Sequence, residues 1–101
     1  MHLHGKSKEV KRRLRELIPD ATLDDFLSIE DKANAGHLRH LPASIRAWQA
    51  LTTHIRHVHT DYDELIKEGY GKNAARHFVF DDINHKLQEW GCTKKLSSKE
   101  Q

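Results

Sequence analysis

The sequence predicts an all-α, compact single-domain bundle of about five helices. Apolar residues recur at steps of three and four along most of the chain, which is the spacing of one face of an α-helix. Proline and glycine separate these amphipathic stretches, and no alternating pattern typical of a β-strand interrupts them. With 101 residues, 37% of them hydrophobic, the chain has material for one core. We expect a helical domain over 8–91, a flexible N-terminus at 1–7 and a disordered tail at 92–101.

The first two predicted helices are separated by a proline. Ser7 is a candidate N-cap for a helix over roughly residues 8–17, and Pro19 ends that helix because proline has no amide proton to donate. Thr22 is the next candidate N-cap, followed by two aspartates that suit the positive end of the helix dipole. The second helix should end near residues 34–36, with a connecting loop over 37–41.

A long third helix should begin at Pro42, which suits a first helical turn. Its larger apolar residues recur at steps of three and four and should face the core; they are Ile45, Trp48, Leu51, Ile55 and Val58. Polar residues occupy the opposite face, which should lie in solvent: Arg46, Gln49, Thr53, Arg56 and His57.

The last two predicted helices follow the tract Thr60-Asp61-Tyr62-Asp63-Glu64-Leu65. Thr60 with Asp63, or Asp61 with Glu64, fits a capping box at the start of a short helix that should end at Gly69. The final helix should run from about residue 71 to Gly91, with an apolar stripe formed by Ala75, Phe78, Val79, Ile83, Leu87 and Trp90. From residue 93 onward the Lys, Ser, Glu and Gln composition predicts a frayed tail.

Composition narrows the class of protein. No apolar run approaches the roughly 18 residues of a membrane span, and residues 1–6 lack the apolar core of a secretory signal. Cys92 is the single cysteine, so no internal disulfide can form. We therefore expect a cytoplasmic protein that does not contact membrane.

Charge distribution points to a nucleic-acid partner, DNA or RNA. The net charge is only +2, but no acid occurs from residue 36 to residue 60, and an acid-free helical face with Arg, Gln and Thr suits phosphate and base edges. A second basic strip lies in the first helix, with Arg13 close by. The candidate contact residues are Lys8, Lys11, Arg12, Arg15, Arg39, Arg46, Gln49, Thr53 and Arg56.

Metal and enzymatic functions have less support. Nine histidines are present, and His54 and His57 are the candidate metal pair because residues three apart share a helical face. A zinc site normally needs three or four ligands, so we expect these histidines to be solvent-facing or packed at the core edge, with no metal or cofactor. No phosphate loop, nucleophile elbow or metallohydrolase motif is present, which favours a non-enzymatic binding module.

A protein-interaction or homodimerising module is the alternative. Phe80 falls off the predicted stripe of the last helix, while Tyr70 and Trp90 lie at helix ends. Exposed aromatic side chains favour partner contact or self-association, although a domain this small can also use every aromatic in its core.

The tract at residues 60–65, together with Gly69, Ala74-Ala75-Arg76, Val79, Leu87 and Trp90, resembles DUF2293, a bacterial domain family of unknown function. The resemblance covers roughly residues 8–91 in order and 41–91 in detail. It implies the same helical order and a cytoplasmic location, and it assigns no activity. Family members carry a Gly- and Arg-rich basic segment where this chain has Ala35-Gly36-His37-Leu38-Arg39-His40, which weakens an anion-binding role for that loop.

Overall fold

The computed structural model describes residues 5–98, and the predictions for residues 1–4 and 99–101 lie outside that range. Within it the chain forms five α-helices and one 3₁₀ turn, with no strand, so the all-α prediction is confirmed. The elements are α1 (Gly5–Leu17), α2 (Leu23–Ala33), η1 (Gly36–Leu38), α3 (Ala43–Val58), α4 (Tyr62–Lys67) and α5 (Lys72–Glu89). None of the described helices is long and apolar enough to cross a membrane.

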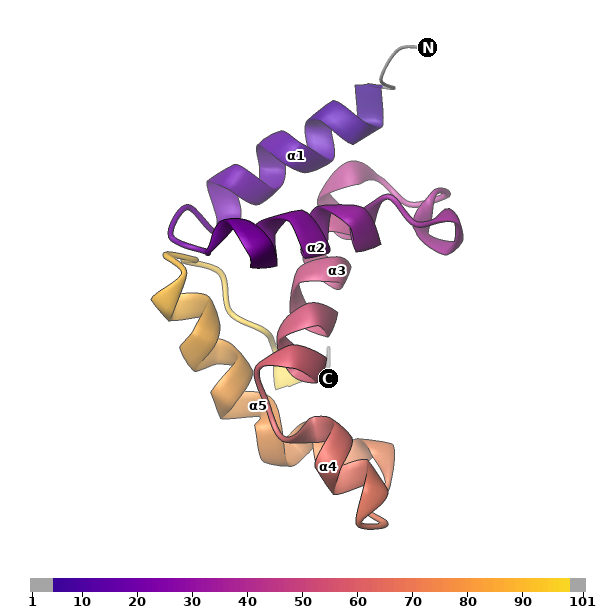
Figure 1. Cartoon of the computed structure of the whole chain (residues 1–101), viewed down its shortest axis with the longest axis vertical. Coiled ribbons are helices and arrows are strands. Elements are labelled where there is room, and N and C mark those ends of the chain that lie inside the picture. The colour runs from indigo at the N-terminus through magenta and orange to yellow at the C-terminus, as the bar shows by residue number, and fades with distance from the viewer. Residues whose placement is uncertain (1–4, 99–101) are drawn as a thin grey trace.

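The molecule measures 45 × 27 × 25 Å, and helix α3 lies at its centre (Figure 1). This helix packs against α1 and α2 at one end and leads into α4 and α5 at the other. Helix α5 then returns to the turn between α1 and α2, where the amide of Asp20 donates to the carbonyl of Trp90 at 3.1 Å. Gly91 has φ +80°, and a Cβ there would lie 2.7 Å from a carboxylate oxygen of Asp20. The positive φ favours glycine at this contact, because L side chains rarely adopt that backbone conformation.

The helix boundaries agree with several of the predicted signals. The Thr22 hydroxyl accepts from the amide of Asp25 at 3.2 Å, so the predicted N-cap of α2 is confirmed. Gly69 ends α4 with φ +102°. Helix α1 begins at Gly5, three residues before the predicted start, and Ser7 lies inside it instead of capping it.

The orientation predicted for α3 is confirmed for Trp48, Leu51 and Ile55, which are buried, and wrong for the two ends of the predicted stripe. The small residues Ala43, Ala47 and Ala50 are buried as well, and short side chains let neighbouring helices pack closely. This packing leaves Ile45 and Val58 exposed. It also buries two arginines that the sequence assigned to solvent, Arg46 and Arg56.

In α5 the predicted apolar stripe is confirmed except at Phe78. Its buried stripe advances by four residues each time and consists of Ala75, Val79, Ile83 and Leu87. Phe78, predicted to be buried, is 59% exposed, whereas Phe80 packs partly buried against the core. Trp90 is buried at the end of the helix.

The predicted disordered tail is wrong for residues 92–98. This segment runs back over the core (Figure 1), where Cys92 is buried and Leu96 is only 3% exposed. The Asn84 side chain accepts from the amide of Leu96 at 2.7 Å and donates to its carbonyl at 3.3 Å. Burial of Cys92 and Leu96, together with the hydrogen bonds of Asn84, therefore holds a stretch whose composition is otherwise polar against the core.

Candidate functional site

Two of the predicted contact residues on α3 are unavailable to a ligand. Arg46 is 4% exposed; its Nε donates to the carbonyl of Ala33 at 2.9 Å and its Nη2 to Oδ1 of Asn34 at 3.0 Å. Arg56 is buried too, with its guanidinium 5.7 Å from the ring centre of Tyr62. The guanidinium of Arg46 thus holds the C-terminal end of α2, and the prediction that both arginines face solvent is wrong.

The other predicted basic residues lie at the surface. Lys8, Lys11, Arg12 and Arg15 line a shallow depression on α1 together with Glu16, which pairs with Arg12 at 3.4 Å in an exposed contact. Arg39 is exposed after η1, whereas Gln49 and Thr53 lie on α3. The basic surface of α1 is therefore physically available to an anion.

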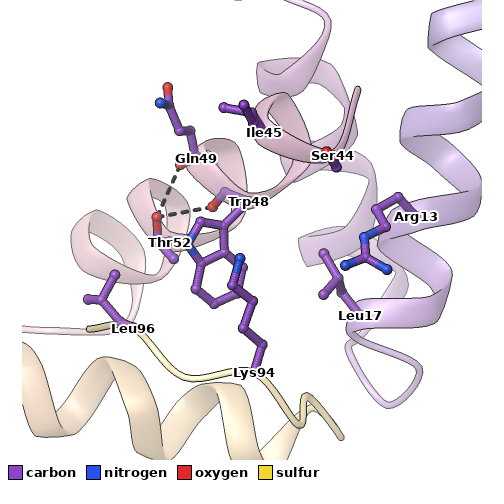
Figure 2. A pocket seen from close by; sticks show the side chains of 9 residues that line it. All are labelled: Arg13, Leu17, Ser44, Ile45, Trp48, Gln49, Thr52, Lys94 and Leu96. Atoms are coloured by element: carbon purple, nitrogen blue, oxygen red, sulfur yellow. Dashed lines mark hydrogen bonds between the residues drawn. The ribbon is translucent and has the colours of Figure 1, made fainter. Parts of the chain in front are cut away.

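A cavity of about 490 Å³ lies between α1, α3 and the C-terminal segment (Figure 2). Its wall combines apolar side chains, hydroxyl and amide groups and two cations, and among residues 5–98 none that lines it is acidic. The lining residues are Arg13, Leu17, Ser44, Ile45, Trp48, Gln49, Thr52, Lys94 and Leu96.

The two cations approach the cavity from different elements. Arg13 extends from α1 and Lys94 from the C-terminal segment, where its Nζ lies 4.2 Å from the ring centre of Trp48 (Figure 2). A cation over an indole face is favourable because the ring face carries partial negative charge. Arg13 has an ion pair with Glu16 at 3.6 Å, but both side chains are about half exposed, so solvent screens the pair. The cavity therefore keeps a positive character.

Most of this cavity was missed by reasoning from the sequence. Arg13 was identified only as a neighbour of the predicted basic strip, and Lys94 lies in the segment that was predicted to be disordered. Leu96 was the one available signal, because an isolated leucine in a polar stretch can anchor it to the core. Gln49 is the predicted contact residue that lines the cavity directly.

The histidines do not form the predicted pair. His57 is exposed, with its Nδ1 2.7 Å from Oδ1 of Asp63. His54 is buried, and its Nε2 lies 2.7 Å from Oδ1 of Asp25, the same oxygen that His59 approaches at 2.8 Å through its Nε2. His54 and His57 thus have different partners, and the cluster that exists joins α2 to the end of α3.

The charge states in this cluster follow from burial and hydrogen bonding. Burial opposes ionisation of Asp25, but hydrogen bonds from His54, His59 and Thr22 outweigh it and hold the pKa of the carboxyl well below its usual range. Burial lowers the pKa of His54, even though the hydrogen bond to Asp25 acts in the opposite direction. At neutral pH the cluster therefore contains an ionised Asp25 and a neutral His54.

The aromatic residues proposed for protein contact are only partly exposed. Trp90 is buried and Phe80 packs against the core, so neither offers a free ring. Tyr70 is exposed and meets the exposed Phe78 edge-to-face, with 5.4 Å between ring centres. The exposed aromatic pair in the described part of the chain is thus Tyr70 with Phe78.

The fold and these sites together define a small all-α domain with a cation-lined cavity beside its central helix. The chain belongs to the family described as "Uncharacterized conserved protein (DUF2293)", whose model matches residues 12–91. This confirms the resemblance carried by the tract at residues 60–65. No curated protein and no solved structure matches the chain. The matched range includes Arg13 and Trp48 and ends before the segment that contributes Lys94 and Leu96.

Proposed function

We propose that this domain is a non-enzymatic binding module for nucleic acid, with a contact surface formed by the cavity between α1, α3 and the C-terminal segment. The observation that carries the proposal is the pair of cations, Arg13 and Lys94, beside Trp48 in a cavity that no acidic side chain of the described residues lines. The surface lysines and arginines of α1 line a separate depression on that helix, together with Glu16, and add further positive charge to the domain.

The chemistry of the lining suits a nucleotide unit. Arginine and lysine neutralise phosphate, and hydroxyl and amide groups such as those of Ser44 and Gln49 hydrogen-bond to sugar or base edges. Aromatic side chains provide stacking surfaces for unpaired bases. Lys94 is exposed, so its side chain can move from the Trp48 ring toward a phosphate. A base can then take the place of the lysine over the indole ring. Single-stranded nucleic acid is therefore the favoured form.

Fluorescence anisotropy of a labelled single-stranded oligonucleotide, measured over a range of salt concentrations, tests the proposal. Replacing both cavity cations, Arg13→Glu with Lys94→Glu, should weaken binding at least about 10-fold. It should also reduce the slope of log affinity against log salt by about 1.4, because two phosphates of the single strand are no longer neutralised. The control Lys67→Glu with Lys72→Glu makes the same charge change on α4 and α5 and should bind far more like wild type. Equal weakening in both double variants would refute a localised site.

The specific observation that favours a second function is the exposed Tyr70–Phe78 pair. Ile66 is also exposed in α4, and clustered apolar side chains on a surface favour protein contact or homodimer formation. Salt separates the two functions, because apolar association persists or strengthens at high salt whereas phosphate contacts weaken. A complex that survives high salt and does not form in Phe78→Ser would favour the protein-interaction function.

A further inference from the structure

The cluster of Asp25, His54 and His59 has the composition and convergence of a metal site. Its three ligand atoms are the Oδ1 of Asp25 and the two imidazole Nε2 atoms, which lie within 4.8 Å of one another. We propose that these residues bind a divalent transition-metal ion of the zinc class. Two histidines and one carboxylate are a common donor set for Zn²⁺, with water in the fourth position.

The distances describe the metal-free state of such a site. Both Nε2 atoms approach the same carboxylate oxygen, at 2.7 and 2.8 Å, which are hydrogen-bond lengths. Metal–ligand bonds of about 2.0–2.2 Å in a tetrahedral site separate neighbouring ligand atoms by about 3.3 Å. An ion that displaces the two N–H protons therefore needs each N···O pair to lengthen by about 0.5 Å. The two imidazole nitrogens, which lie within 4.8 Å of each other, must also take up the tetrahedral separation.

The surroundings already orient two of the ligands. The hydroxyl of Thr22 donates to Oδ2 of Asp25 at 2.8 Å, leaving Oδ1 directed at the histidines. The indole of Trp90 packs edge-on against the ring of His59, 5.3 Å between centres, and lies 6.5 Å from that of His54. Fixed ligand orientation is what the residues behind a metal ligand normally provide. His54 is 4% exposed, Asp25 15% and His59 24% as side chains, so the site is open to water on the His59 side.

Lys32 gives the proposal its most specific consequence. Its Nζ lies 2.9 Å from Nδ1 of His54 and donates to it in the metal-free protein. A neutral histidine that binds metal through Nε2 carries its proton on Nδ1, so that atom becomes a donor and a lysine ammonium can no longer pair with it. Lys32 is exposed and must move into solvent when metal binds. Lys32→Glu would instead supply a carboxylate acceptor for the Nδ1 proton, the usual partner of a metal-bound histidine.

Calorimetric titration of the full chain with Zn²⁺, supported by the visible absorption of Co²⁺, tests the proposal. We expect one bound ion, at least about 10-fold weaker binding in His59→Ala and Asp25→Asn, and about 10-fold tighter binding in Lys32→Glu. His57→Ala is the matched control, because it removes an exposed histidine that also pairs with an aspartate, and it should leave affinity unchanged. His2→Ala with His4→Ala identifies any binding by the N-terminal histidines.

The proposal is overturned if Zn²⁺ does not bind, or if all binding disappears when His2 and His4 are replaced. Equal affinity in wild type and His59→Ala would also overturn it. If His59→Ala fails to fold, the Zn²⁺ affinity of Lys32→Glu still tests the proposal, because Lys32 is exposed and can be changed without disturbing the core. A Lys32→Glu variant that binds Zn²⁺ no more tightly than wild type would contradict the assigned role of His54.

Discussion

Replacing the buried Arg46 by leucine should destabilise the fold by about 3 kcal/mol. The guanidinium is 4% exposed and donates two hydrogen bonds, to the carbonyl of Ala33 and the side chain of Asn34. Hydrogen bonds that involve a charged group contribute about 1.5–3 kcal/mol each. Leucine refills part of the volume and removes the need to bury a charge, which offsets part of the loss. The remaining penalty comes from the unpaired carbonyl at the end of α2.

Urea unfolding followed by far-UV circular dichroism measures this loss directly. Arg12→Leu is the control, because the Arg12 side chain is 68% exposed and forms an exposed ion pair with Glu16. It should change the free energy of unfolding by no more than about 0.5 kcal/mol. If Arg46→Leu unfolds at the same urea concentration as the control, Arg46 lies in solvent. The burial of this face of α3 would then be refuted, and Arg46 would return as a candidate phosphate contact.

Three further predictions follow from the packing and the charge states. Leu96→Ala should lower the free energy of unfolding by about 2–3 kcal/mol, measured by urea unfolding, and an unchanged value would mean that the C-terminal segment is not docked. Phe78→Ala should change stability by less than about 1 kcal/mol while Val79→Ala lowers it by about 2 kcal/mol; the reverse order in thermal melts would mean that α5 is rotated. Burial lowers the pKa of His54 in the folded state, so below about pH 6.5 the unfolded chain binds a proton that the folded chain excludes. The free energy of unfolding should therefore stay constant above about pH 6.5 and fall below it, by at most about 1.4 kcal/mol per pH unit. Melts in EDTA should show this dependence flattened in His54→Gln, and an identical pH profile would contradict the assignment.

The helix order could be predicted because its signals are local. Pro19 ends α1 because it has no amide proton, and the Thr22 hydroxyl caps the start of α2, so the boundary between the two helices follows from local chemistry. Gly69 and Gly91 end their helices with positive φ, which can be anticipated from a glycine that follows an apolar stripe.

The rotation of α3 could be predicted only in part, because periodicity alone identifies more than one face. Trp48, Leu51 and Ile55 of the large-residue stripe are buried and so are the alanines at 43, 47 and 50, so the buried face includes members of both stripes. The arginine at position 46 is compatible with that face because the end of α2 supplies acceptors for its guanidinium. No spacing rule within α3 carries that information.

The candidate sites also depend on residues far apart in the sequence. His59 meets Asp25 across 34 positions, and the cavity needs Lys94 to return from the end of the chain to Trp48 on α3. The sequence could nominate basic residues on α1 and histidines on α3. It could not show that Arg13 belongs with Lys94, because only the tertiary fold brings them to one cavity.

The central claim is that the cavity between α1, α3 and the C-terminal segment contacts nucleic acid. A chemical-shift titration of the labelled protein with short mixed-sequence DNA and RNA, as single strands and duplexes at low and moderate salt, tests it most directly. We predict shifts centred on Arg13, Trp48, Gln49 and Lys94 that fade as salt rises. An absence of shifts at low salt, or shifts confined to Tyr70 and Phe78, would contradict the claim.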